Sequence, residues 1–323
     1  MNKGMFLTLF RIAPFRPLGF GLALLLCAAA AWAQPQATGI AVIYPDIGEP
    51  YRSIFAQIVR GIEERAGGKV VPVAIGAVVD ADAMNDTLRH KGVKVAIALG
   101  RQGMKAAALV DRGIGVVVGG VLAAQYNEPR SMQVNILSPD PALLFSRLKE
   151  MMPRARRVFV VYDSRQNAWL IRLAKEAARA RGMELEAYEA EDLRGAMRAY
   201  HEILAVADSR RDALWLPQDS ITVEESAVLP MVLQESWARS LAVFSSSFGH
   251  VKRGALFSMY PDNTDLGREL AVSALEMLAA GGRDVSGMAP LREAQLAVNL
   301  RTAKHLGVDP GSAQGVDLTY PER

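Results

Sequence analysis

The residues best able to do chemistry in this chain follow the ends of short apolar runs. Parallel sheets bind ligands at the carboxyl ends of their strands, so polar side chains placed there predict a binding site. Carboxylates, amides, hydroxyls and guanidinium groups are suited to hydrogen-bond a small polar molecule. The candidate ligand-binding residues are Asp46, Glu49, Tyr51, Arg52, Arg101, Gln102, Asp163, Gln218, Asp219, Ser220, Ser245, Ser246 and Ser247.

Three of these candidates have a specific structural alternative. Asp219 follows the apolar run 213–216 directly, so it either contacts a ligand or caps the next helix. Tyr51 belongs to a helical apolar stripe, which favours packing in the core over contact with a ligand. Arg52 lies about 100° around the same helix and is therefore free to reach a ligand or an acid.

Sequence signatures of enzymes are incomplete or absent. His201-Glu202 lacks the second histidine of the zinc-binding helix motif, and the four histidines are scattered. Ser146 and Lys149 have the S-x-x-K spacing without its companion motifs. The glycines at 113, 115, 119 and 120 precede or end a predicted strand, the wrong order for a dinucleotide loop. We therefore predict a protein that is not an enzyme and has no metal or cofactor.

Alternating strands and helices must position these residues. Each apolar run is short, as buried strands are, and amphipathic helical stretches separate the runs. The helices include 51–66, 166–181, 191–205 and 224–238, the last with a capping box from Thr222 and Glu225. The expected strands are 40–44, 70–75, 95–99, 116–118, 158–162, 185–188, 213–216 and 241–244.

Two such sets predict two parallel sheets, each covered by helices. Segment 135–141 carries two prolines, and Asp140-Pro141 is a good helix start, so we expect the first crossover there. A strand at 255–259, a helix at about 263–279 and a strand near 294–300 are too few for a third domain. We expect an N-terminal lobe of 34–134 plus about 246–285. The C-terminal lobe is then 135–245 plus about 286–323.

The first 33 residues predict a cleaved signal peptide. Lys3, Arg11 and Arg16 precede an apolar run over 18–31, and Ala31-Trp32-Ala33 supplies small residues at the cleavage positions. Cleavage would leave Gln34 as the first residue and place the protein in the periplasm. Lipidation at Cys27 and an uncleaved anchor are the alternatives.

Composition limits the partners of the mature chain. The 323 residues include 37 bases and 34 acids, and removing the predicted signal leaves 34 of each. A neutral chain gives no electrostatic argument for nucleic acid, and we predict no nucleic-acid partner. The single cysteine lies in the signal, so the mature chain has no disulfide and no cysteine-based metal site.

Four segments carry a family resemblance: ALWLPQDS at 213–220, VFSSSFGHVKRGA at 243–255, YPDNTDLG at 260–267 and VNLRTAKHLG at 298–307. They resemble the substrate-binding proteins of ABC transporters, in the subgroup that includes tryptophan- and tyrosine-binding members. The resemblance covers most of the C-terminal half and, more loosely, 140–190. It implies a type I periplasmic binding-protein architecture, an α/β fold of two Rossmann-like lobes joined by a hinge of several crossovers.

The resemblance also implies a small-molecule ligand held between the lobes and an ABC permease in the inner membrane as partner. The alternative is a periplasmic sensor or accessory protein that uses the same fold to signal to a membrane partner. The chain departs from the family at Ser245-Ser246-Ser247, where an acidic residue is usual, and at Ser220, where Asn is usual. Loss of that acid weakens the case for an α-amino ligand, although Asp219 remains able to pair with an ammonium group.

Overall fold

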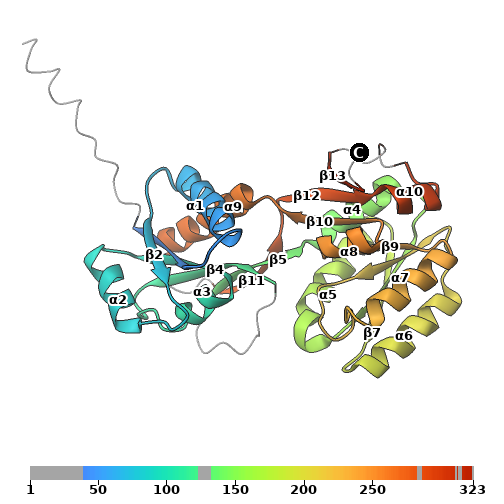
Figure 1. Ribbon diagram of the computed structural model, residues 1–323, viewed down its shortest axis with the longest axis horizontal. Coiled ribbons are helices and arrows are strands. Elements are labelled where there is room, and N and C mark those ends of the chain that lie inside the picture. The colour runs from blue at the N-terminus through green and yellow to red at the C-terminus, as the bar shows by residue number, and fades with distance from the viewer. Residues whose placement is uncertain (1–38, 123–131, 282–285, 310, 312–314, 322–323) are drawn as a thin grey trace, which may run out of the picture. The chain divides into compact units, whose positions relative to one another are not determined.

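The computed structural model describes residues 39–122, 132–281, 286–309, 311 and 315–321. In this part of the chain, strands and helices alternate and build two sheets (Figure 1). The predicted signal, residues 1–33, lies outside the described residues. Among the described helices, each is too short or too polar to span a lipid bilayer.

The first sheet has six strands in the order β11-β5-β4-β3-β1-β2, and all of its pairs are parallel. Edge strand β2 contains Pro72, which has no backbone N–H to donate to a neighbouring strand and is therefore tolerated at a sheet edge. The strands are β1 (Ile40–Pro45), β2 (Val71–Ile75), β3 (Val95–Leu99), β4 (Gly115–Val121), β5 (Gln133–Pro139) and β11 (Gly287–Leu291).

Alternate residues of these strands pack against helices on opposite faces. Ile40 and Val42 join a core with α1 (Tyr51–Ala66) and α9 (Asn263–Ala279). Ala41 and Ile43 join the other core, with α2 (Ala81–His90) and α3 (Gly100–Ala107). Successive residues of a strand point to opposite faces, and helices cover both faces of β1. The β1 run is therefore apolar throughout.

The second sheet has seven strands in the order β13-β12-β10-β9-β8-β6-β7. Its pairs are parallel except for β10 with β12, which run antiparallel. The strands are β6 (Arg157–Tyr162), β7 (Glu184–Glu189), β8 (Asp212–Leu216), β9 (Ala242–Ser245), β10 (Phe257–Pro261), β12 (Ala294–Asn299) and β13 (Val316–Tyr320). The helices are α4 (Pro141–Met151), α5 (Ser164–Ala180), α6 (Leu193–Val206), α7 (Val228–Ala238), α8 (Phe248–Arg253) and α10 (Leu300–Leu306). The predicted fold class is confirmed.

The chain passes between the two sheets three times, and the passages differ from the predicted lobe boundaries. All of β5 belongs to the six-stranded sheet, so the first passage follows Pro139 rather than residue 134. There Asp140 caps α4 by accepting the backbone N–H of Ala142 at 2.8 Å, as predicted. The second passage follows β10, which pairs within the seven-stranded sheet, and the third separates β11 from β12. β5, β11 and β13 were not predicted as strands, because prolines, glycine and polar residues interrupt their apolar pattern.

Helices α1 and α9 lie side by side (Figure 1) and touch through two glycines. A Cβ atom built on Gly61 would stand 1.9 Å from the carbonyl oxygen of Thr264. One built on Gly267 would stand 2.1 Å from the carbonyl oxygen of Ile58. The two backbones therefore approach closely enough that no larger residue fits at either position.

The predicted capping box at the start of α7 is wrong. The hydroxyl of Thr222 donates instead to the carbonyl of Val161 at 3.0 Å, and α7 begins only at Val228. Glu224 accepts the backbone N–H groups of Ser226 and Ala227, at 2.8 and 2.7 Å. The hydroxyl of Ser226, followed by these backbone N–H groups, lowers the pKa of Glu224 to about 2. Thr222 is unavailable as a cap because it is buried against the end of β6.

Candidate ligand-binding site

Asp219, at the carboxyl end of β8, is buried and holds three loop segments together. Its Oδ1 accepts the backbone N–H groups of Ile221 and Thr222, at 3.0 and 2.9 Å. Its Oδ2 accepts the backbone N–H of Asp163 at 2.7 Å and the side-chain amide of Asn167 at 2.9 Å. All four donors are neutral and belong to the protein, so in this conformation the carboxylate is fully occupied without a ligand.

Asp163, at the carboxyl end of β6, is also bonded internally. It caps α5, and its carboxylate accepts hydrogen bonds from the guanidinium group of Arg165 and the amide of Gln166, at 2.9 to 3.2 Å. Burial favours a raised pKa for Asp163, but the bonds from Arg165 and Gln166 outweigh it and leave the pKa below its usual value. Asp163 and Asp219 are therefore brought together as the anchors of one hydrogen-bond network.

Ser245, the last residue of β9, is fully buried and bonded to a buried histidine. Its hydroxyl donates to the carbonyl of Leu216 at 3.1 Å and accepts the backbone N–H of Ser247 at 3.0 Å. His250 Nδ1 lies 2.8 Å from the same oxygen. Since the serine proton is used by Leu216, this arrangement assigns the imidazole proton to Nδ1. Burial lowers the pKa of His250 to about 4, so the ring is neutral at pH 7.

Ser246 and Gln218 link neighbouring strand ends. The hydroxyl of Ser246 accepts the indole N–H of Trp215 at 3.0 Å, and its carbonyl accepts the Gln218 amide at 3.2 Å. The amide oxygen of Gln218 accepts the hydroxyl of Ser138 at 3.2 Å. Ser138 belongs to β5, so this bond joins the two sheets close to the first passage of the chain. Ser247 is half-buried and precedes α8, and Ser220 is exposed.

The candidates of the six-stranded sheet are mostly exposed. Tyr51 is 56% exposed, so the prediction that it packs in the core is wrong. The apolar stripe of α1 starts to pack only at Ile54 and Phe55, because the helix begins at Tyr51 and its first turn extends past the sheet. Asp46, Glu49 and Arg52 are exposed as well, and Glu49 accepts the hydroxyl of Ser53 at 2.7 Å.

Arg101 and Gln102 lie on the first turn of α3, close to the start of α1. The ring of Phe55 comes within 3.7 Å of where a side chain on Gly100 would begin. The amide of Gln102 donates to the carbonyl of Ala77 at 3.3 Å, while Arg101 is exposed. The loops after β1, β2 and β3 thus meet at this edge. Among the described residues, no hydrogen bond joins these candidates to those of the seven-stranded sheet.

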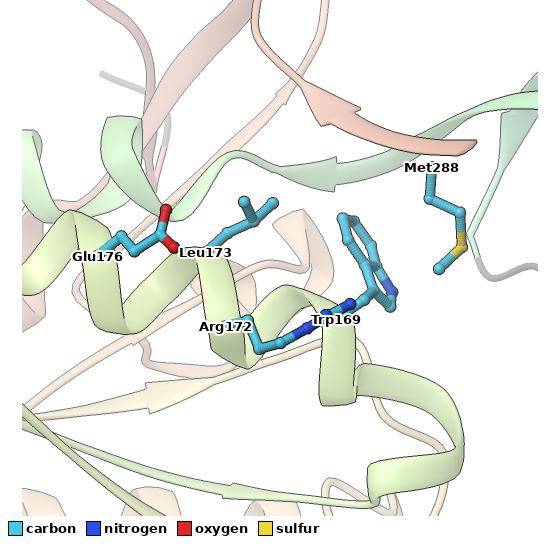
Figure 2. Close-up of a pocket in the computed structure, with 5 residues that line it drawn as sticks. All are labelled: Trp169, Arg172, Leu173, Glu176 and Met288. Atoms are coloured by element: carbon cyan, nitrogen blue, oxygen red, sulfur yellow. The ribbon is translucent and has the colours of Figure 1, made fainter. Parts of the chain in front are cut away.

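A pocket of about 330 Å³ lies elsewhere, on one face of α5 (Figure 2). It is lined by Trp169, Arg172, Leu173 and Glu176 of α5 and by Met288 of β11. None of these residues was predicted as a site residue. Their helical spacing of three and four residues is visible in the sequence, but such a stripe usually marks a core-facing or solvated helix face. Met288 completes the pocket from β11, a strand that the sequence did not predict.

Ser245 and His250 form a buried serine–histidine pair in the described part of the chain. The Ser245–His250 pair is the nearest approach to an activated nucleophile, yet Ser245 is fully buried and its proton is bonded to a carbonyl. In the described part of the chain, no group of three or more His, Cys, Asp or Glu is arranged to hold a metal ion.

Comparison with known proteins agrees with the two-sheet architecture. The family model described as ABC transporter substrate binding protein matches residues 117–312. No curated protein matches the chain. CD0873 from Clostridium difficile, described as a substrate binding protein with adhesive properties in a ligand-free, open structure, is 18% identical with a TM-score of 0.57. The alignment covers 86% of this chain and 98% of that one.

Two further structures are similar at a TM-score of 0.51 and 16% identity. One is an ABC domain in complex with L-Trp from Streptococcus pneumoniae, with 87% of this chain and 98% of that chain covered. The other is a conserved domain protein from Vibrio cholerae, with 87% and 99% covered. At this level of identity the similarity establishes a shared fold.

Proposed function

The chain belongs to the ABC transporter substrate-binding protein family, and on that premise we propose that it captures a small solute in the periplasm and delivers it to an ABC permease in the inner membrane. The observation that carries the proposal is the family match over residues 117–312, which includes all three passages between the sheets. The predicted signal peptide supports export.

Capture requires two sheets that can move relative to one another. Three chain passages form the hinge, and the Ser138–Gln218 hydrogen bond lies beside the first of them. A solute that contacts residues of both sheets shifts the hinge toward a closed state by its higher affinity for that state.

We expect the strand-end candidates to divide into two roles. The buried members hold the loops: Asp163, Asp219, Ser245 and Ser246. The more accessible members contact the solute: Asp46, Glu49, Tyr51, Arg52, Arg101, Gln102, Gln218, Ser220 and Ser247. This division follows from the hydrogen-bond capacity that the buried groups have already used.

A thermal-shift screen of the purified protein against amino acids, nucleosides, vitamins and sugars tests the proposal. A solute that binds only the folded protein stabilises it by about 2.7 kcal/mol at a hundred times its Kd. We expect at least one class to raise the Tm, no product to form, and small-angle scattering to show compaction. Turnover of the bound solute, or binding without compaction, would contradict capture by a hinged binding protein.

A further inference from the structure

The α5 pocket has the form of a small-molecule site apart from the strand ends. Its four helix residues follow the spacing i, i+3, i+4, i+7, so they share one face of α5. Figure 2 shows Trp169 and Leu173 projecting from this face, with Met288 approaching from β11. The volume of about 330 Å³ is at the lower end of the range for ligand pockets, which suits a molecule of one or two rings.

The indole of Trp169 is held in place by its surroundings. It packs against the core of the seven-stranded sheet around Leu170 and also against the core of the six-stranded sheet around Val134. A ring fixed by packing on two sides loses little conformational freedom when a ligand stacks on it. Met288 adds a polarisable thioether and Leu173 an apolar surface, both suited to contact with a flat ring.

The charged groups of the pocket remain available to a ligand. Arg172 and Glu176 are exposed, and neither takes part in a salt bridge of the described chain. They differ in this from Asp163 and Asp219, whose carboxylates are occupied by protein donors. Residues four apart on a helix have Cβ atoms about 6 Å apart, so one ligand can reach both. Arg172 supplies donors and Glu176 supplies acceptors.

We propose that this pocket is a second binding site, for a flat, ring-containing solute that carries both a hydrogen-bond acceptor and a hydrogen-bond donor. The ring stacks on Trp169, the acceptor faces Arg172 and the donor faces Glu176. An aromatic amino acid and a nucleobase share this chemistry. Because the lining residues come from α5 and β11, the occupant touches elements of both sheets and its binding is coupled to hinge closure. Its lining residues are separate from the strand-end residues, so the two sites affect one another only through the hinge.

Calorimetry with defined probes tests the ligand class. L-tryptophan and adenine carry all three features, whereas benzoate lacks the donor, tryptamine lacks the acceptor and L-leucine lacks the ring. We expect L-tryptophan or adenine to bind at least about tenfold more tightly than the three incomplete probes, and which of the two binds identifies the source. Failure of both complete probes, or equal binding of an incomplete one, overturns the ligand class.

Variants locate the site. Arg172→Gln and Glu176→Gln change exposed side chains, and each is expected to weaken the bound probe roughly 10- to 100-fold. Lys175→Gln is the matched control, because Lys175 is exposed on the same helix and does not line the pocket. Arg52→Ala is the second control, at the strand ends. Loss of binding in Arg52→Ala with no loss in the pocket variants overturns the second site and leaves the proposed function standing. If the only solutes that raise the Tm are ones whose effect is lost in Arg172→Gln and Glu176→Gln, capture by the strand-end residues fails and the pocket stands.

Discussion

Replacing Asp219 with Asn is expected to lower the free energy of unfolding by about 3 to 6 kcal/mol. The remaining amide oxygen can still accept the N–H groups of Ile221 and Thr222. The new amide nitrogen then stands where Oδ2 accepts from Asp163 and Asn167, so donors face donors at 2.7 and 2.9 Å. Two buried hydrogen bonds to a charged acceptor are lost, and each is worth about 1.5 to 3 kcal/mol.

Urea denaturation followed by circular dichroism measures this loss. Asp46→Asn is the matched control, because Asp46 also follows a strand but is exposed, and its free energy of unfolding should stay within about 0.5 kcal/mol of wild type. If Asp219→Asn is within about 1 kcal/mol of wild type, the carboxylate does not hold the loops and the reasoning from its four bonds is wrong. If solute affinity falls while stability is unchanged, Asp219 is a ligand contact instead.

Three further predictions concern the helix contact of α1 with α9, the buried His250 and the buried Tyr200. Gly61→Ala and Gly267→Ala should each lower the free energy of unfolding by about 3 kcal/mol or more. Gly67→Ala is the control: it is strained only by the left-handed φ of 70° at that position, and should lower the free energy of unfolding by about 1 kcal/mol. Equal denaturant midpoints for all three variants would contradict the close contact between the helices. His250 has a pKa of about 4 in the folded protein and about 6.5 in the unfolded chain. Between these two pH values the unfolded chain binds one more proton than the folded protein. The free energy of unfolding therefore falls by up to about 3 kcal/mol as the pH drops from 6.5 to 4. His250→Asn keeps a donor for Ser245 and should remove this part of the pH dependence, which parallel denaturation series at pH 7 and pH 4.5 would reveal. Among the described residues, the buried hydroxyl of Tyr200 has no hydrogen-bond partner. Tyr200→Phe should therefore leave the protein equally stable or more stable by about 1 kcal/mol, and a clear loss of Tm would show that a partner exists.

Much of the fold could be predicted because its strands are buried on both faces and therefore apolar. The runs at 95–99 and 213–216 correspond closely to β3 and β8. β5 and β11 could not be predicted in the same way. β5 mixes asparagine, serine and proline with its apolar residues, and β11 contains Gly287 and Pro290, so neither shows an uninterrupted apolar run. Missing them moved the predicted lobe boundaries.

The sequence located strand ends but not what their side chains do. Position alone placed Asp163, Asp219 and Ser245 beside the end of a strand, as the structure has them. It could not show that their hydrogen bonds are used within the protein, because the donors are loop N–H groups and distant side chains such as Asn167. Tyr51 was assigned to the core because periodicity marks a helix face and not where the sheet beneath it ends.

The three passages of the chain between the sheets determine when each sheet can be completed during synthesis. The six-stranded sheet gains α9 only after residue 279 and its edge strand β11 only after residue 291, and the seven-stranded sheet then still needs β12 and β13. Until α9 has been made, the glycine-bearing side of α1, with Ile58 and Ile62, has no α9 to cover it. Each of the two cores is therefore completed late in synthesis, after segments that belong to the other sheet have been made.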